Sequence, residues 1–200
     1  KKIAAYEAML TKCTSLVCEE LSLVSSEEIP DLELFELLRS VGEIQEITCF
    51  RARDETYPLD VMRVEYTWRF HAGKNSGSGD DQCFFGMLTL KKNFPLTYIY
   101  KETITEKLTD LLLKVDVDFN NSKKFSRRFH VVTKDRAALE RLLGNAPLDE
   151  LARFPDMELE INGNKCLFRN CKEPITMYPD SEERTALFIE LAKSLTRVLG

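Results

Sequence analysis

The chain has 200 residues, of which 44% are hydrophobic and 30% are charged, and its formal net charge is -5. A chain of this length can bury a sizeable core, as one large domain or as two small ones. The acidic balance argues against a general nucleic-acid binder, because such domains are usually net basic. No run of about 18 apolar residues and no secretory signal are visible, so the sequence predicts a cytoplasmic protein.

The chain begins with two predicted helices. Apolar residues recur along one side of residues 2–24, which is the pattern of an amphipathic helix. This apolar stripe is broad, so the helix either packs on the core of the domain or forms an arm that packs on a second copy or continues an upstream coil. Pro30 and Asp31 then begin a second, short helix that ends near Gly42.

A β-rich section follows, with strands predicted over 43–53 and 59–70. One face of the second strand is apolar and carries Met62, Val64, Tyr66, Trp68 and Phe70. Such an aromatic ladder either stacks bases or forms the core face of a sheet, and the helix available to cover it favours the core face. The Gly/Ser-rich stretch 71–81 is predicted to be a mobile connection, and strands near 83–90 and 96–100 complete a meander.

The middle of the chain predicts a helix, a strand pair and a second helix. The first helix is expected over 103–113. Residues 115–119 alternate between apolar and acidic side chains, as in a half-buried strand, and the turn formers at 120–122 lead to a second strand over 129–133. Asp at the start of 135–144 then caps a helix that ends in Gly-Asn.

The last part of the chain repeats this arrangement on a smaller scale. Residues 157–161 alternate between apolar and acidic side chains. Asn162 and Gly163 are typical of a type I′ hairpin, from which residues 165–169 return. Asp180 caps a final helix, whose predicted buried stripe consists of Leu187, Phe188, Leu191, Leu195, Val198 and Leu199.

These motifs carry a family resemblance. The order of a Phe-x-x-x-Phe segment (Phe125 to Phe129), a Val-Val strand, an Asp-started helix and an Asn-Gly hairpin resembles a group of uncharacterised bacterial proteins. In those proteins a membrane-anchoring segment precedes a soluble α+β domain. The resemblance covers roughly residues 42–169 and includes upstream aromatic and turn positions, namely Tyr66, Trp68, Phe70 and Phe94-Pro95-Leu96. It implies an α+β architecture and an intracellular bacterial setting, and it implies no reaction.

The hairpin connections and the grouping of helices before and after them predict an α+β fold. In this fold, antiparallel sheet is covered by amphipathic helices at both termini. Strand pairs and helices occur in both halves, which suggests a pseudo-duplicated layout. We expect residues 1–200 to form a single α+β domain, and a subdivision into 1–114 and 115–200 is the alternative.

The six cysteines include no Cys-x-x-Cys pair and no zinc-ligand spacing to a histidine. Reduced, mostly buried thiols are expected, and a disulfide between Cys166 and Cys171 is the alternative. The carboxylate pairs Asp116/Asp118 and Glu158/Glu160 lie on the polar faces of predicted strands and are expected to be solvated, although such a pair could bind a hard cation with help from elsewhere. No Gly-rich phosphate loop occurs, so the sequence predicts no metal and no cofactor.

The densest positive run, here called the basic segment, consists of Lys123, Lys124, Arg127 and Arg128. It is either a solvated turn beside two buried phenylalanines or a contact for an acidic partner or for anionic lipid head groups. The buried phenylalanines would hold the segment in place, so that its charges point outward together. Salt should weaken binding through such a segment.

Two functions are consistent with these observations. The first is a non-enzymatic interaction or scaffold domain of a larger, membrane-tethered bacterial protein, located in the cytoplasm or at the cytoplasmic face of the membrane. Its partner would be another protein or a second copy bound through the N-terminal helix, with no nucleic acid, and membrane proximity would come only through a segment outside this sequence. The second is a hydrolase or thiol enzyme whose site assembles from distant residues such as Cys83, His130 or the Asp116/Asp118 pair.

Overall fold

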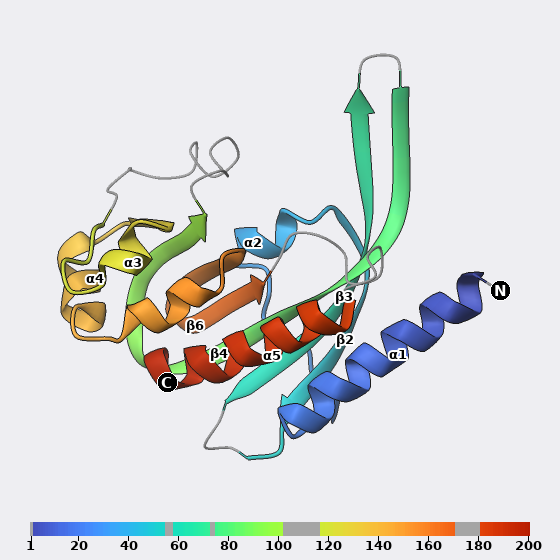
Figure 1. Ribbon diagram of the computed structural model, residues 1–200, viewed down its shortest axis with the longest axis horizontal. Helices are drawn as coiled ribbons and strands as arrows, with labels where there is room; N and C mark the ends of the chain where they lie inside the picture. Colours follow the sequence, from blue (N-terminus) through green and yellow to red (C-terminus); the bar gives the residue numbers. More distant parts are fainter. Residues whose placement is uncertain (1, 55–57, 73–74, 102–116, 171–180) are drawn as a thin grey trace.

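The computed structural model describes residues 2–54, 58–72, 75–101, 117–170 and 181–200 (Figure 1). Six strands of these ranges form one antiparallel sheet, in the order β1-β2-β3-β4-β5, with β6 also paired to β4. The strands are β1 (Leu23–Ser26), β2 (Glu43–Ala52), β3 (Leu59–Ala72), β4 (Asn75–Lys101), β5 (Phe129–Thr133) and β6 (Met157–Asn170). The helices are α1 (Lys2–Glu20), α2 (Glu36–Arg39), α3 (Lys123–Ser126), α4 (Arg136–Leu143), the 3₁₀-helix η1 (Leu148–Arg153) and α5 (Ser181–Leu199). The predicted α+β fold is therefore confirmed.

Strand β4 is 27 residues long and pairs with β3, β5 and β6. Its first part pairs with β3, and its last part pairs with β5 and β6. Two predictions are wrong here. The stretch predicted as a mobile connection forms the ends of β3 and β4, which pair from Ala72 and Asn75 onward, and the two strands predicted near 83–90 and 96–100 are parts of one strand. Gly and Ser are poor strand formers, but the long partner strand overrides this local preference.

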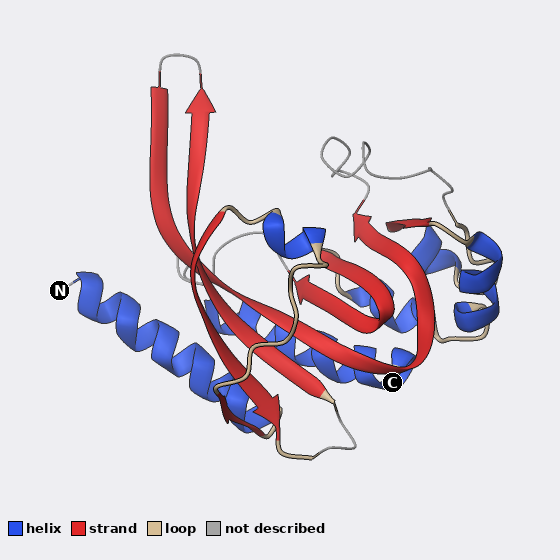
Figure 2. Ribbon diagram, turned by 180° about the vertical axis from the view of Figure 1, so that it is seen from behind, coloured by secondary structure: helices blue, strands red, loops and turns tan. Residues whose placement is uncertain are grey.

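Strands β4 and β6 bend together, with β6 on the inside (Figure 2). Gly163 lies at the inner bend with φ +60, a conformation that glycine adopts without steric cost. The predicted type I′ hairpin at Asn162 and Gly163 is wrong, because residues 157–170 form one bent strand that pairs with β4 on both sides of Gly163. Along the outer strand, the stretch from Thr89 to Thr97 faces the shorter stretch from Lys165 to Ile161, and the pairing shifts register twice between them. The outer strand needs these extra residues because its arc is longer.

Both faces of the sheet are covered, by different helices. On β3, Val61 belongs to the larger apolar cluster, which also contains residues of α1 and α5. The adjacent Met62 belongs to a second cluster, which contains Phe35 and residues of α2. On the predicted core face of β3, Met62, Val64 and Tyr66 are buried and Trp68 is half-buried, while the side chain of Phe70 lies outside the described part of the structure. The segment around α2 covers this face rather than the terminal helices.

Several predicted element boundaries need correction. Helix α1 ends at Glu20 instead of residue 24, because Ser22 adopts φ 53 and turns the chain into β1. Helix α2 is much shorter than the predicted helix from Pro30 to Gly42. Residues 117–119 keep the predicted alternation of burial without forming a strand. In α5, Leu187 is 37% exposed rather than part of the buried stripe.

Several predicted features lie outside the described residues, namely the helix over 103–113, the cap at Asp180, Asp116 and Cys171. The amphipathic character of the terminal helices and the pseudo-duplicated layout remain predictions, and so does the choice between one domain and a subdivision after residue 114. Strand β4 precedes that point and pairs with β5 and β6, which follow it.

Candidate interaction site

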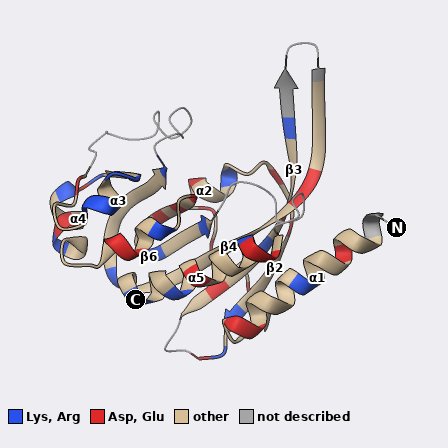
Figure 3. Cartoon of the chain, viewed as in Figure 1, with Lys and Arg blue, Asp and Glu red and all other residues tan. Residues whose placement is uncertain are grey.

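The basic segment lies on α3 and the turn that follows it, close to η1 and α4 (Figure 3). All four cationic side chains are exposed to solvent. Lys123 and Lys124 lie in the single turn of α3, and Arg127 follows as its C-terminal cap residue. The structure therefore brings the predicted residues together on one surface, as their closeness in sequence requires.

Buried aromatic rings hold this segment against the core. Phe125 has no exposed surface and Phe129 is 4% exposed, and their ring centroids lie 5.1 Å apart. Phe119 meets Phe125 edge-on, with the centroids 6.1 Å apart. Burial of a phenylalanine side chain stabilises a fold by roughly 1.5–3 kcal/mol. The backbone that carries the cations is therefore fixed at both ends by apolar packing.

Hydrogen bonds fix the segment further. The backbone N–H of Phe125 donates to Asp149 Oδ1 (3.0 Å), and the Ser126 hydroxyl oxygen accepts from the backbone N–H of Phe119 (2.9 Å). The Arg128 guanidinium donates to the carbonyl oxygen of Ala152 in η1. Arg128 thus ties the segment to η1, whereas Lys123, Lys124 and Arg127 form no ion pair with any described residue.

The residues of the alternative, enzymatic hypothesis lie in separate places. Cys83 is buried in the second apolar cluster, at the β4 position that pairs with Val64. His130 lies on β5, where it faces Tyr100 near the other end of β4, with 5.9 Å between the ring centroids. Asp118 is exposed. The described part of the chain does not gather these residues into one site.

Three of the described thiols have environments that favour the protonated form. Burial raises the pKa of the Cys166 thiol to about 12, and it also raises the pKa values of Cys18 and Cys49. A thiol with a raised pKa is a poor nucleophile at neutral pH, because the reactive species is the thiolate. Cys166 is not part of a disulfide. These three positions therefore favour a structural role.

The prediction that Glu158 and Glu160 lie on a solvated strand face is wrong. Both side chains are buried. Glu158 Oε2 accepts from Arg169 Nε (2.6 Å) in an ion pair whose partners are both 5% exposed. The Arg169 guanidinium also lies over the ring of Phe85, 5.5 Å from its centroid, and donates to Ser40 Oγ (3.4 Å). A buried charge of this kind requires its partner.

Glu160 joins β6 to α2. Its carboxylate accepts from the backbone N–H of Leu37 (2.7 Å) and from the Tyr98 hydroxyl (3.0 Å). Burial raises the pKa of Glu160, although these donors oppose the shift, and burial beside Glu160 raises the pKa of Tyr98. The carboxylate therefore positions α2 on the sheet. No local pattern predicts this contact, because Leu37 is distant in the chain and period-2 alternation describes only the strand itself.

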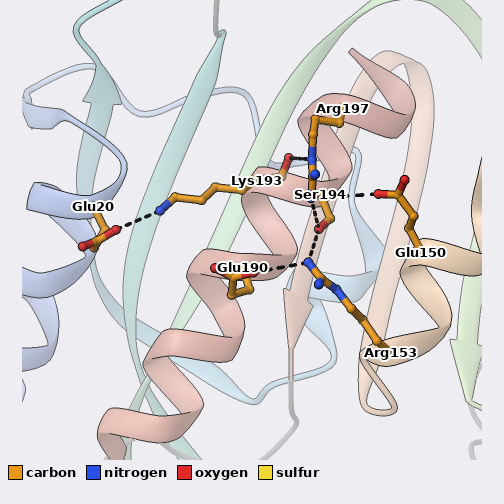
Figure 4. Close-up of polar contacts among 7 residues, drawn as sticks. All are labelled: Glu20, Glu150, Arg153, Glu190, Lys193, Ser194 and Arg197. Atoms are coloured by element: carbon orange, nitrogen blue, oxygen red, sulfur yellow. Dashed lines mark hydrogen bonds and ion pairs between the residues drawn. The ribbon is translucent and has the colours of Figure 1, made fainter.

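A second polar region, which the sequence analysis did not single out, lies where α5 meets α1 and η1 (Figure 4). Lys193 pairs with Glu20 of α1 (2.8 Å), and Arg153 of η1 donates to Glu190 (3.2 Å) and to Ser194 Oγ (2.9 Å). The hydrogen bond from Lys193 lowers the pKa of Glu20. Exposed pairs of this kind contribute about 0–1 kcal/mol each.

Beside this region is an open pocket of about 640 Å³, lined by Ser22, Arg53, Leu59, Ala192, Lys193 and Arg197 among others. A second open pocket, of about 530 Å³, is bordered by the exposed side chains of Ile29 and Leu34. Some of the charged groups in the two pockets pair with each other, as Arg51 does with Asp60 (2.7 Å) and Glu28 (2.6 Å). Neither pocket presents a convergent set of free polar groups that would define a ligand.

Within the described ranges, no three His, Cys, Asp or Glu side chains gather closely enough to hold a metal ion. No helix that the structure describes is both long enough and apolar enough to cross a membrane. No family model, curated protein or solved structure matches this chain. The resemblance to bacterial membrane-anchored proteins therefore stays a prediction.

Proposed function

We propose that this chain is a non-enzymatic interaction domain that binds an acidic protein partner through Lys123, Lys124 and Arg127. The observation that carries the proposal is the combination of exposed cations, which form no ion pair with any residue the structure describes, with a backbone anchored by the fully buried Phe125. Arg128 has a different role, since its contact with Ala152 holds the segment in place.

An anchored segment favours binding for a physical reason. Ordering a flexible tail on a partner costs conformational entropy, and a segment that is already ordered avoids most of that cost. The cations also stand out against the net charge of -5 of the whole chain. Complementary charge would therefore steer an acidic partner to this surface and away from the remainder of the protein.

An acidic protein fits the segment better than a lipid surface does. Segments that bind membranes usually combine basic residues with apolar side chains that enter the interface. Here Phe125 and Phe129 are both buried in the core, so the segment has no aromatic side chain to insert. Attraction to anionic lipid would rest on charge alone, at roughly 1 kcal/mol per cation near the surface.

The wider setting of the domain belongs to the same proposal. The resemblance described above supports a bacterial, cytoplasmic domain within a larger, membrane-tethered protein. Amphipathic terminal helices and a pseudo-duplicated layout would suit a scaffold, and the N-terminal helix is a second candidate surface for self-association. The alternative of a hydrolase or thiol enzyme gains no support from Cys83 and His130, which lie apart on the sheet.

The test measures binding of a fluorescent peptide of ten glutamates, with vesicles that contain anionic lipid as a second probe. The variant Lys123→Ala/Lys124→Ala/Arg127→Ala removes the three unpaired cations. Its matched control, Lys91→Ala/Lys92→Ala/Arg53→Ala, removes the same charges from other exposed positions. The proposal predicts that the first variant loses roughly ten- to hundred-fold in peptide affinity, from about 0.5–1 kcal/mol per cation, and that the control does not.

Salt provides the second criterion, because charge-driven binding should weaken as ionic strength rises from 0.05 to 0.3 M, roughly. Equal peptide binding by both variants, insensitive to salt, would reduce the basic segment to a solvated turn. Binding to vesicles but not to the peptide would replace the acidic protein with a lipid surface as the partner.

A further inference from the structure

The ends of β3 and β4 project from the body of the molecule as a two-stranded ribbon (Figures 1 and 2). The pairing of β2 with β3 ends where Glu43 faces Thr67, and the pairing of β6 with β4 begins only at Gly86. Between these limits, 68–72 of β3 pair only with 75–79 of β4 among the described strands, and Asp80 and Asp81 of β4 have β3 as their only described partner strand. We call these residues the ribbon.

The direction of the backbone groups along the ribbon follows from one hydrogen bond. The backbone N–H of Thr89 donates to the carbonyl of Pro58 (2.9 Å), and the antiparallel register continues without a shift to the pair of Ala72 and Asn75. In such a ladder, successive residues point their N–H and C=O groups alternately to the two sides. Ser76, Ser78 and Asp80 therefore direct theirs away from β3, where the structure describes no partner strand.

This open edge has little of the protection that edge strands usually carry. Natural edges are blocked by prolines, lysines, bulges or inward-pointing charges, and the stretch 75–81 contains no proline, no lysine and no register shift. Its two carboxylates are engaged by neighbouring residues of β3 and β4. Asp80 accepts from the Thr67 hydroxyl (2.6 Å), and Asp81 is buried and accepts from the backbone N–H of Gln82.

One face of the ribbon is also stiffened. Gly79 lies opposite Trp68, and a Cβ atom at Gly79 would come within 2.8 Å of the indole ring. The indole therefore packs directly on the glycine backbone, an arrangement that stabilises glycine-rich strands. A two-stranded ribbon is only marginally stable alone in water, and further strands would support it.

We infer that the edge of β4 in the ribbon pairs with the same edge of a second copy, which makes a four-stranded sheet across a two-fold axis near Ser78. Antiparallel pairing of identical strands is self-complementary, as a two-fold interface requires. With the axis at Ser78, Asp80 faces Ser76 of the partner and Asp81 faces Asn75. An axis at Asp80 would place two carboxylates opposite each other, which is unfavourable.

A second copy explains the edge better than a foreign peptide does. Peptides that add to a sheet edge gain their specificity from side-chain pockets beside that edge. The two pockets of about 530 and 640 Å³ are both lined by residues outside the ribbon. Because side chains such as those of Ser76 and Ser78 are small and polar, backbone hydrogen bonds are the main interaction that this edge offers. The best partner is therefore a strand whose side chains are equally small and polar.

The test compares the molar mass of the whole chain in solution, by light scattering during gel filtration, across a range of concentrations. The inference predicts that wild type reaches twice the 23.1 kDa of one chain. Ser78→Lys places two like charges at the axis and should return the protein to monomers. Ser25→Lys makes the same change at an exposed serine of β1 and should leave the dimer intact.

Hydrogen exchange of wild-type protein gives a second measurement that does not depend on a variant. At high concentration, the amides of Ser76, Ser78 and Asp80 should become protected, whereas those of Gly77 and Gly79 are protected by β3 at every concentration. A monomer at all concentrations would overturn the inference. So would a dimer that persists in Ser78→Lys, or one in which the three amides still exchange freely.

Discussion

Strand β6 and the basic segment both carry several charges within a few residues, yet the two regions use them in opposite ways. The carboxylates of Glu158 and Glu160 are buried, and each has a specific partner, Arg169 of the same strand for Glu158 and the Leu37 backbone of α2 for Glu160. The ammonium groups of Lys123 and Lys124 are exposed and have no partner among the described residues. Buried carboxyl groups of the first kind fix the fold through their partners, and exposed charges of the second kind are available to another molecule.

Whether a charged residue contributes to stability or to binding depends on how far its side chain is buried. Exposed ion pairs contribute little to stability, because water and salt screen them. A buried carboxylate that loses its partner retains the full cost of its desolvation. Substitutions in β6 should therefore act on the free energy of unfolding, while substitutions in the basic segment should act on binding and leave stability almost unchanged.

The largest effect is expected at Arg169. Arg169→Ala removes the buried ion pair with the Glu158 carboxylate and the contact with Phe85, so it should lower the free energy of unfolding by about 3–5 kcal/mol. Urea unfolding followed by circular dichroism measures this change. Arg136→Ala, which breaks the exposed pair with Glu140, is the control and should cost no more than about 1 kcal/mol. Equal costs for the two variants would contradict the comparison.

The next effect concerns the attachment of α2. Glu160→Ala leaves the N–H of Leu37 and the hydroxyl of Tyr98 without their acceptor, which should cost roughly 2–4 kcal/mol. Hydrogen exchange should also show faster exchange of the Leu37 amide. Glu160→Gln keeps an acceptor oxygen in place and should retain most of the stability at neutral pH. Equal destabilisation by Gln and Ala would show that the charge itself holds α2.

A pH dependence follows from the same carboxylate. Burial raises the pKa of Glu160 above its ordinary value of 4.5, so the folded state holds this proton more tightly than the unfolded chain does. The stability that this group contributes is therefore complete below about pH 4.5 and is lost as pH rises through the folded-state pKa. Relative to wild type, Glu160→Gln should gain stability as pH rises from about 4 to 7. Parallel stability curves for the two proteins would contradict this prediction.

The smallest effects separate the two arginines of the basic segment. Arg128→Ala removes the hydrogen bond to the Ala152 carbonyl and should cost about 1–2 kcal/mol, because the donor is charged and the contact is partly buried. Arg127→Ala should change the free energy of unfolding by less than about 0.5 kcal/mol, since its side chain is exposed. The same urea titration measures both. A larger cost at Arg127 would mean that its charge serves the fold.

Local sequence patterns predicted the elements that depend on local chemistry. Strand β5 has the expected bounds, and Asp135 caps α4 by accepting from the backbone N–H of Ala138 (2.9 Å). The buried positions of Phe125 and Phe129 also followed from their size and hydrophobicity. In each case the deciding interaction lies within a few residues of the pattern that predicts it.

The features that the sequence did not predict depend on contacts between distant residues. The Gly/Ser-rich start of β4 forms a strand because β3 pairs with it along its whole length. The Glu160 side chain is buried because α2 covers it, and nothing near Glu160 in the sequence indicates that cover. Helix α1 ends early at Ser22, a residue type that rarely signals a left-handed conformation.

The most direct test of the division between β6 and the basic segment is a paired measurement on the variant Lys123→Ala/Lys124→Ala/Arg127→Ala. Its free energy of unfolding and its affinity for the ten-glutamate peptide at low salt are both compared with wild type. The account predicts an unfolding free energy within about 0.5 kcal/mol of wild type, together with at least a roughly ten-fold loss of affinity. An unchanged affinity, or a loss of stability as large as that of Arg169→Ala, would contradict it.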